Sequence, residues 1–531
     1  MQRGRSTHEP ATLRESGRLI HGRRSRSLAC SRSCRASVRL AWLAIKPAVQ
    51  LALNSSDRHA NLRDELEPGA MSSAHPRDRL PRVLSLWDAS MLIVASVVGS
   101  GIFFTPSRVA ELLPSAGLIL LAWIVGALIS LAGAFANAEL GAMFPRAGGD
   151  YVYLREGIHP AAGFLVGWIS FFAIYAGTIA ALAVVFAESM APVLGLERPG
   201  IIGLSALMIL LCSLLNMRGT RWGAALNNMT STAKIVALIA FVALGPLFGS
   251  GSFEPWLGMT GASGTGAGEA LASGEGGGLL SFGQALSPIL FSYLGWNASV
   301  YVASEIKDPA RNVPRSLFLG LGVCAGLYLL VNGIYLYALT PSELIESGDA
   351  GAAAATALFG DFGGQLVAIF VLVSVVGTLN ATILVGPRII YAMALDGLFF
   401  RDADRIHKGF STPSAAIAVQ AAVSIALVVF LESFPKALDF TVFGIILATS
   451  ADVLALFFLR RRQPDRERPY RAWGYPWLPA LYLAVNLSIG AAIAVASPRE
   501  CAVTLAVLAA GLLIYRPVAR AADRRAAEPS E

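Results

Sequence analysis

The sequence is poor in charged residues. Asp, Glu, Lys and Arg make up 15% of its 531 residues, compared with about 25% in an average soluble chain. Hydrophobic residues make up 55%, and the mean hydropathy is +0.59. Length alone would allow three or four soluble domains. The composition excludes a soluble enzyme and predicts an all-α polytopic membrane protein.

Cysteine and histidine are also scarce. Cys30 and Cys34 lie in the N-terminal region, and Cys212, Cys324 and Cys501 stand alone in or beside apolar segments, so their spacing indicates neither a disulfide framework nor a metal site. All six histidines lie in tails or loops. A membrane-embedded enzyme usually gathers such residues near one face. We therefore expect no enzymatic activity, no cofactor and no bound metal.

The formal net charge of +7 comes from basic residues in tails and short loops. This distribution is typical of a membrane protein with one positive side and does not indicate nucleic-acid binding. Residues 1–83 are predicted to form a basic, disordered cytoplasmic tail, because their apolar run at 40–53 is shorter than the ~20 residues of a spanning helix. A nucleic-acid arm and sequence upstream of the true start are the alternatives, and the native initiator is expected at Met71.

Apolar stretches recur from residue 86 onward and predict twelve transmembrane helices. Their expected ranges are 86–112, 116–140, 160–188, 199–217, 222–248, 282–305, 315–339, 364–391, 414–431, 437–459, 475–496 and 500–516. The Gly-rich stretch 249–281 and the Ala-rich stretch 351–357 are expected to be flexible outer loops. The predicted organisation is a first five-helix repeat at 84–248, the 249–281 loop and a second, inverted repeat at 282–460. Helices 11 and 12 follow in 461–516, and a cytoplasmic tail ends the chain at 517–531.

The loops alternate in charge. One set is basic, with Arg218 and Arg221 in one loop and the run 460–471 in another, whereas the opposite set carries acids such as Glu343 and Glu346. The positive-inside rule places the basic loops and both termini in the cytoplasm, which requires an even number of spans. The expected location is the cell (cytoplasmic) membrane.

Small residues interrupt the first and sixth predicted spans near mid-membrane. Gly99 and Gly101 flank Ser100 in the first, and a small and polar run ends at Asn297 in the sixth. Close helix packing is the alternative interpretation of the first motif. Because five spans separate the two, spans 1–5 and 6–10 would be repeats, the second inverted, with a transporter site between the broken helices. Free N–H groups and carbonyls there suit a zwitterion such as an amino acid.

Several motifs in order resemble the amino acid–polyamine–organocation superfamily of permeases and its L-type amino acid transporter-like branch. They are Val98–Phe103, Ala138–Gly141, Gly148–Tyr153, Phe291–Asn297 and Ser304–Pro314. The resemblance covers about Leu84 to Arg460 and is weaker beyond that range. It implies an inverted five-helix repeat with broken helices 1 and 6, followed by two further helices.

The resemblance also implies a substrate site. The N–H groups around Ser100, Gly101 and Ile102 would hold the substrate carboxylate. Carbonyls around Phe291, Ser292 and Leu294 would hold its ammonium group, and Phe291 would gate the site, although a plain packing role for this aromatic is equally open. The complete predicted set is Val98, Gly99, Ser100, Gly101, Ile102, Phe291, Ser292, Tyr293, Leu294 and Trp296.

Lys234 lies well inside the fifth predicted span. An ionisable residue at that depth costs about 2.5 kcal/mol or more, which favours a functional role over a lysine that extends to the interface. The resemblance implies that its amine replaces the charge of the sodium ion of sodium-coupled relatives. Asp452, in the tenth span, is given no role, and Glu139 and Glu305 are expected to contact basic residues.

The expected function is secondary transport of amino acids, neutral ones first, by alternating access and without sodium. Proton symport and exchange both remain open, so protons are a candidate partner beside the substrate and the lipid bilayer. An amine or polyamine exchanger and a non-transporting nutrient sensor on the same fold are the alternatives. Relatives that pair covalently with a heavy chain carry a cysteine after span 3, and residues 187–199 have none, so no covalent heavy-chain partner is expected.

Leu294 provides a test of the substrate class. The corresponding position is acidic in transporters of cationic amino acids, so Leu294→Asp is expected to raise uptake of lysine and arginine relative to neutral amino acids. Competition assays in proteoliposomes would measure the ratio. An unchanged ratio would remove this position from the specificity determinants.

Overall fold

The structure, a computed structural model, describes residues 78–113, 115–249, 251–252, 278–430 and 434–527. The predictions about the tail up to residue 77, the initiator Met71, the loop residues 253–277 and the last four residues lie outside this range. Every regular element in the described residues is a helix, and the two β pairings among them are isolated bridges, Leu84 with Ile306 and Ala147 with Val302. The all-α class is confirmed.

The first half of the described chain contains the first five predicted spans. Its elements are α2 (Leu86–Val97), α3 (Gly101–Leu112), α4 (Ala116–Met143), α5 (Asp150–Gly157), α6 (Pro160–Ile169), the π-helix η2 (Ser170–Tyr175), α7 (Ala176–Leu194), α8 (Arg198–Met217) and α9 (Thr220–Phe248). A capping box starts α2, in which the Ser85 hydroxyl accepts from the Asp88 N–H and the Asp88 carboxylate accepts from the Ser85 N–H.

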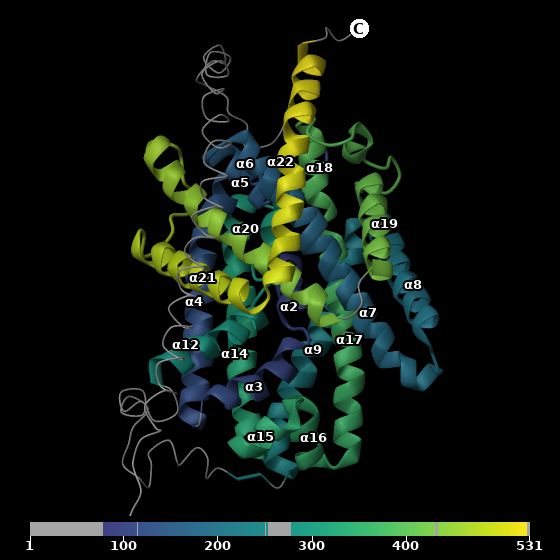
Figure 1. Cartoon of the computed structure of the whole chain (residues 1–531), viewed down its shortest axis with the longest axis vertical. Coiled ribbons are helices and arrows are strands. Elements are labelled where there is room, and N and C mark those ends of the chain that lie inside the picture. The colour runs from purple at the N-terminus through teal and green to yellow at the C-terminus, as the bar shows by residue number, and fades with distance from the viewer. Residues whose placement is uncertain (1–77, 114, 250, 253–277, 431–433, 528–531) are drawn as a thin grey trace, which may run out of the picture. The chain divides into compact units, whose positions relative to one another are not determined.

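The second half contains the remaining spans and two helices between them. Its elements are α12 (Gly278–Ser292), α13 (Ala298–Tyr301), η4 (Ala303–Glu305), α14 (Pro309–Ala338), α15 (Pro341–Ser347), α16 (Ala350–Phe359), α17 (Asp361–Val385), α18 (Pro387–Leu395), η5 (Arg401–Asp404), α19 (Ser414–Phe430), α20 (Phe434–Arg462), α21 (Trp477–Ala496) and α22 (Pro498–Ala527). In Figure 1, α15 and α16 lie at one end, and α5 and α18 lie at the other.

Length and composition support fewer spans than the twelve predicted. Nine helical segments in the described residues are long and apolar enough to cross a membrane, or ten if the bent pair α2 and α3 counts as one. The other two predicted spans coincide with the broken segment from α12 to η4 and with α19. They fall short because α12 has 15 residues before its break and α19 has 17. These two spans stay predictions.

The Ala-rich stretch 351–357 is helical, so its prediction as a flexible loop was wrong. The Asp349 carboxylate accepts from the Ala352 N–H at 3.0 Å and caps α16. Alanine has the highest helix propensity, so a capped Ala-rich segment readily forms a turn of helix. Other boundaries also move: α12 already begins at Gly278, and α22 continues through Ala527 into the predicted tail.

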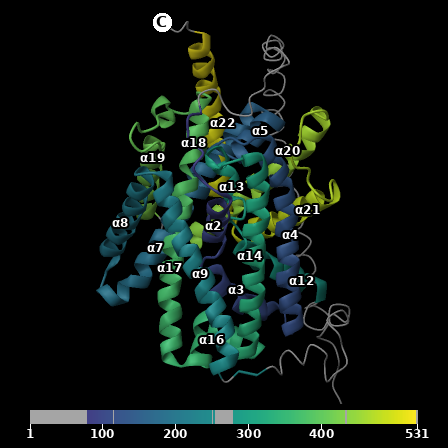
Figure 2. The ribbon, with the colours of Figure 1, turned by 180° about the vertical axis from the view of Figure 1, so that it is seen from behind.

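Helix contacts between the first five predicted spans and the next five recur in a matching pattern. If span 1 is exchanged for span 6, span 2 for span 7 and so on, the following packing pairs correspond to each other. α14 packs against α2 as α4 packs against α12. Likewise, α9 packs against α17 as α20 packs against α7, and α9 contacts α14 as α20 contacts α4. These matched pairs agree with a repeat of five spans. Figure 2 shows α2 in the interior, beside α9, α14 and α17.

The helices α8, α21 and α22 expose much of their apolar surface. The apolar windows of α8, α21 and α22 are 28%, 22% and 17% buried. Leu214 on α8 and Leu513 on α22 are among the exposed side chains. Apolar faces of this extent are compatible with lipid as the surrounding solvent.

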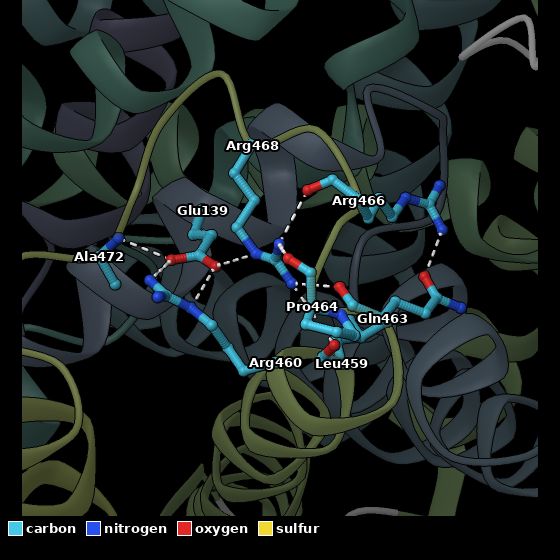
Figure 3. A network of polar contacts seen from close by, with 8 residues as sticks. All are labelled: Glu139, Leu459, Arg460, Gln463, Pro464, Arg466, Arg468 and Ala472. Atoms are coloured by element: carbon cyan, nitrogen blue, oxygen red, sulfur yellow. Dashed lines mark hydrogen bonds and ion pairs between the residues drawn. The ribbon is translucent and has the colours of Figure 1, made fainter.

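Glu139, near the end of α4, is fully buried and is held by the end of α20 and the segment that follows it (Figure 3). Arg460 donates to its two carboxylate oxygens at 2.8 and 2.6 Å, and Arg468 Nε donates at 3.1 Å. The Ala472 N–H donates at 2.7 Å. The prediction that Glu139 contacts basic residues is confirmed, although its partners lie far along the chain.

Glu305 in η4 forms a second buried ion pair, also as predicted. Arg388 Nε on α18 donates to its carboxylate at 2.8 Å, and both side chains are fully buried. Thr220 Oγ1 at the start of α9 donates to the same carboxylate at 2.6 Å and accepts from Arg388 Nη2 at 3.0 Å. This cluster joins segments from both halves of the chain.

Arg388→Met is expected to destabilise the protein strongly, because it leaves the buried Glu305 charge unpaired. Breaking such a pair costs about 3–5 kcal/mol. The matched control is Arg405→Met, whose ion pair with Asp402 is exposed and should contribute about 1 kcal/mol or less. Melting temperatures of the purified variants in detergent would compare the two. Equal melting temperatures would contradict the structural role of Arg388.

Candidate functional site

The first predicted break is present. α2 ends at Val97 and α3 begins at Gly101, and their axes bend by 48°. No side chain caps the start of α3, where the Ser100 carbonyl accepts from the Phe103 N–H at 3.1 Å. The Gly101 and Ile102 N–H groups, which precede Phe103 in the first turn, have no intrahelical acceptor, so this end of α3 can donate hydrogen bonds to an anion.

The second break separates α12 from α13. Residues 293–297 form turns in place of the helix, and Gly295 adopts a left-handed backbone with φ of +99°. The Leu294 N–H donates to the Phe291 carbonyl at 3.0 Å, and the Ala298 N–H donates to the Gly295 carbonyl at 3.1 Å. The carboxyl end of α12 therefore faces the break, and its carbonyls suit a cation.

The two breaks are in direct contact. A Cβ added at Gly295 would lie 2.9 Å from Ser96 Cβ at the end of α2, and one added at Gly101 would lie 2.9 Å from Ser292 Oγ. Ser292 Oγ also lies 2.7 Å from Thr105 Oγ1 on α3. The glycines thus allow the interrupted backbones to approach each other closely.

Tyr328 on α14 links both breaks. Its hydroxyl lies 2.8 Å from the Val97 carbonyl and 3.0 Å from the Ser292 carbonyl, and it can donate its proton to either oxygen. The side chain is fully buried, and its ring packs on Trp123 and Tyr293. Two carbonyls released by the helix interruptions therefore share one donor.

A cavity of about 170 Å³ lies between the breaks. Helices η2 and α7 line it with Tyr175 and Thr178, and α17 adds Thr378 and Thr382. Further side chains come from α5, α13 and α20. The lining therefore combines predicted spans 1, 3, 6, 8 and 10. A cavity between the two repeats is where transporters of this architecture hold their substrate.

The predicted substrate residues divide into two groups. Gly99, Ser100, Gly101, Phe291, Ser292 and Leu294 line the cavity. Val98, Ile102, Tyr293 and Trp296 are buried in packing around it. Trp296, for example, packs edge-on against Tyr482 on α21. A role in binding for this second group would have to pass through the backbone or through neighbouring side chains.

Lys234 lies behind the first break. Its side chain is fully buried, and its amine donates to the Ala95 and Val98 carbonyls at 3.1 and 2.6 Å. Thr378 Oγ1 accepts from the amine at 3.2 Å. These carbonyls belong to the carboxyl end of α2, where the helix dipole stabilises a positive charge.

The sequence interpretation missed two groups of residues around the breaks. Ser374 and Thr378 donate to carbonyls at the end of α2, at 3.0 and 2.9 Å. Their spacing of four residues, continued by Thr382, forms a polar stripe on an otherwise apolar helix, and this signal was present in the sequence. Tyr328 carries no such local signal.

Two interrupted membrane helices that meet at a cavity are the architecture of a membrane transport protein. The chain belongs to the amino acid permease family, whose family model matches residues 84–514. The match covers both breaks, Lys234 and every element that lines the cavity.

Relatives of known name cover most of the chain. The serine/threonine exchanger SteT of Bacillus subtilis is 29% identical over 448 residues, which is 83% of this chain and 98% of that protein. The human large neutral amino acids transporter small subunit 2 is 28% identical over 86% of both chains. The human Asc-type amino acid transporter 1 is 26% identical over 84% of both chains.

Gly295→Ala is expected to disrupt the contact between the breaks, because the new Cβ would meet Ser96 and the backbone would be strained by about 1–3 kcal/mol. Gly283→Ala on α12 is the matched control, since nothing lies within 4 Å of its added Cβ. Size-exclusion profiles of the solubilised variants would report the folded fraction. A folded fraction equal to that of Gly283→Ala would contradict the proposed close approach.

Proposed function

We propose that this protein is a sodium-independent transporter of neutral amino acids that works by alternating access, as an exchanger or a proton symporter. The observation that carries the proposal is the cavity between the breaks. The amino end of α3 faces it with free N–H groups, and the carboxyl end of α12 faces it with carbonyls. A zwitterion would be held at both of its charged groups.

The orientation of the substrate follows from these helix ends. Its carboxylate would accept from the N–H groups of Ser100, Gly101 and Ile102, and its ammonium group would donate to carbonyls of Phe291, Ser292 or Leu294. The Ser292 carbonyl already accepts from Tyr328, but a carbonyl oxygen has two lone pairs and can accept a second hydrogen bond.

The remaining lining favours a neutral side chain. It is mostly apolar or hydroxyl-bearing, with Ile174, Leu182 and Ile445 beside the threonines already named. The names of the relatives, which include exchange of serine and threonine and transport of large neutral amino acids, support this substrate class. Among the described residues of the lining, Asp150 is the one acidic residue, and an amine exchanger would need it as a free anion.

Lys234 supports independence from sodium. Its amine occupies the carbonyl-lined position at the end of α2, so a sodium ion there would meet a like charge. The proposed role of Lys234 is a charge substitute that keeps the first break in a binding-competent shape.

We further place the protein in the cell membrane with both termini in the cytoplasm. The basic loops of the sequence support this orientation. The acidic capping residues Glu343 and Asp349 belong to α15 and α16, at the end opposite α5 and α18 (Figure 1). A covalent heavy chain is not part of the proposal, because residues 187–199 contain no cysteine.

Uptake of labelled serine and leucine into proteoliposomes without sodium tests the function. The assay would be run with empty and serine-loaded vesicles, and with and without an imposed proton gradient. Uptake that needs internal serine would establish exchange, and uphill uptake driven by the gradient would establish symport. No uptake under any condition, or displacement by putrescine but not by leucine, would contradict the proposal.

Lys234→Ala is expected to lower sodium-free uptake at least about tenfold, which corresponds to about 1.4 kcal/mol, because the carbonyls of α2 lose their charged donor. Lys408→Ala, at an exposed loop position, is the control and should transport as the wild type does. Normal sodium-free uptake by a folded Lys234→Ala variant would refute the assignment.

A further inference from the structure

Two buried carboxyl groups lie beside the cavity. Asp150 begins α5 and Asp452 lies on α20, and both side chains are buried, at 1% and 0% exposure. The helices that carry them pack against each other, and the two carboxyl groups are close enough to interact. Tyr301 on α13 donates to Asp150 Oδ2 at 2.5 Å, whereas Asp150 Oδ1 and both oxygens of Asp452 have no donor among the described residues.

The surroundings of this carboxyl pair contain no described cation. The titratable groups that act on it are Tyr153 on α5, Tyr175 on η2, Tyr301 on α13 and Tyr482 on α21. Asn137 on α4 is fully buried, is close enough to Asp452 to interact with it, and has no hydrogen-bond partner among the described residues. Elsewhere in the described core, Glu139 and Glu305 are paired with arginines. The carboxyl pair therefore differs from the other buried acids.

Two ionised carboxylates cannot share a hydrogen bond, because each can only accept. Two like charges at this range in a buried site also disfavour full ionisation, so one proton is retained between them. Burial raises the pKa of the Asp150 carboxyl, while its hydrogen bonds with Tyr301 and Asp452 act in the opposite direction. A shared proton would join one oxygen of Asp150 to one oxygen of Asp452, and it leaves the second Asp452 oxygen to the amide of Asn137.

The carboxyl pair meets the cavity through Asp150 and lies where several elements come together. Asp150, Tyr175 and Tyr301 all line the cavity. Beside them, the Gly148 N–H donates to the Tyr301 carbonyl at 3.1 Å, and Ala147 bridges Val302. The pair thus joins α5 and α20 where α13, which follows the second break, packs against the loop before α5.

We propose that Asp150 and Asp452 form a proton-binding site that holds one shared proton, and that loss of this proton loosens the side of the cavity closed by α5 and α13. This inference deepens the proposed transport function and rests on it for its effect on flux. The proton site itself can be tested without transport.

The direction of the pH effect follows from linkage. A carboxyl pair that binds its proton more tightly in the folded state than in the unfolded state loses stability as pH rises, from the unfolded pKa of about 4 up through the folded pKa. The melting temperature of the wild type should therefore fall between pH 5.5 and 8.5. Asp452→Asn keeps one carboxylate and supplies an amide donor in place of the proton, so its melting temperature should fall less.

Melting temperatures in detergent across this pH range test the site, with Asp150→Asn as the second variant and Asp361→Asn, at an exposed position at the start of α17, as the control. The control should follow the wild type, and at least one pair variant should have a flatter profile. Profiles parallel to the wild type in both pair variants would overturn the proton site, as would a wild-type melting temperature that does not change with pH.

Sodium is the competing occupant. Replacing choline chloride by sodium chloride should leave the wild-type melting temperature unchanged. A rise with sodium that is lost in Asp452→Asn would overturn the proposal in favour of a bound sodium ion.

The effect on flux is measured as exchange of labelled serine in serine-loaded proteoliposomes. Wild-type exchange should fall as pH rises, by up to about tenfold per unit above the apparent pKa, and Asp452→Asn should show a flatter profile. Equal pH dependence in both proteins would overturn the link to transport. Absence of wild-type exchange at every pH would instead refute the proposed function, while the melting profiles would still decide on the proton site.

Discussion

A backbone that leaves the helix inside a membrane must find partners for its freed polar groups, since lipid offers none. The rest of this structure depends on how that requirement is met at the end of α2. Lys234 donates to the Ala95 and Val98 carbonyls, and Ser374 and Thr378 donate to the same two oxygens. A helix end with fixed donors of this kind can stay interrupted without water, which makes the first break a stable feature of the fold.

The two helix ends at the first break differ in how far their backbone polar groups are hydrogen-bonded. The carbonyls of α2 are saturated by protein donors, whereas the N–H groups at the start of α3 have no capping side chain. The second break shows the complementary arrangement, because Tyr328 satisfies only part of the carboxyl end of α12. Protein donors therefore satisfy the carbonyls at the end of α2 and part of those at the end of α12. The N–H groups of α3 and the remaining carbonyls of α12 converge on one cavity. This division explains how a rigid scaffold can present unsatisfied backbone to a substrate.

The sequence predicted the features that depend on residues close together along the chain, namely the two breaks and the buried lysine. Gly99 and Gly101 marked the first break, the run after Phe291 marked the second, and Lys234 stood out because a charge in an apolar helix is costly. The helix at 350–359 was missed because its Gly and Ala content was interpreted as loop composition, while the cap at Asp349 was overlooked. Two of the twelve predicted spans, at 282–305 and 414–431, stay predictions, since α12 and α19 are short.

Contacts between distant segments were out of reach of the sequence. Arg388 and Glu305 are separated by 83 positions, and Tyr328 lies 231 positions from the Val97 carbonyl that it reaches. The sequence showed Asp452 in the tenth span without a role and Asp150 only as part of a motif, and only the fold brings them together. Such pairs depend on tertiary packing, for which a single sequence without aligned relatives carries no covariation.

The cluster around Glu139 has a consequence for biosynthesis. Its carboxylate enters the membrane with α4, but the Ala472 N–H that completes its coordination is made 333 residues later. Until Arg460 and Arg468 emerge from the ribosome, α4 holds an acid without a partner and favours a position near the interface. The chain from residue 460 onward therefore completes this step of assembly, and a nascent chain stopped before residue 460 would leave the Glu139 carboxylate unpaired.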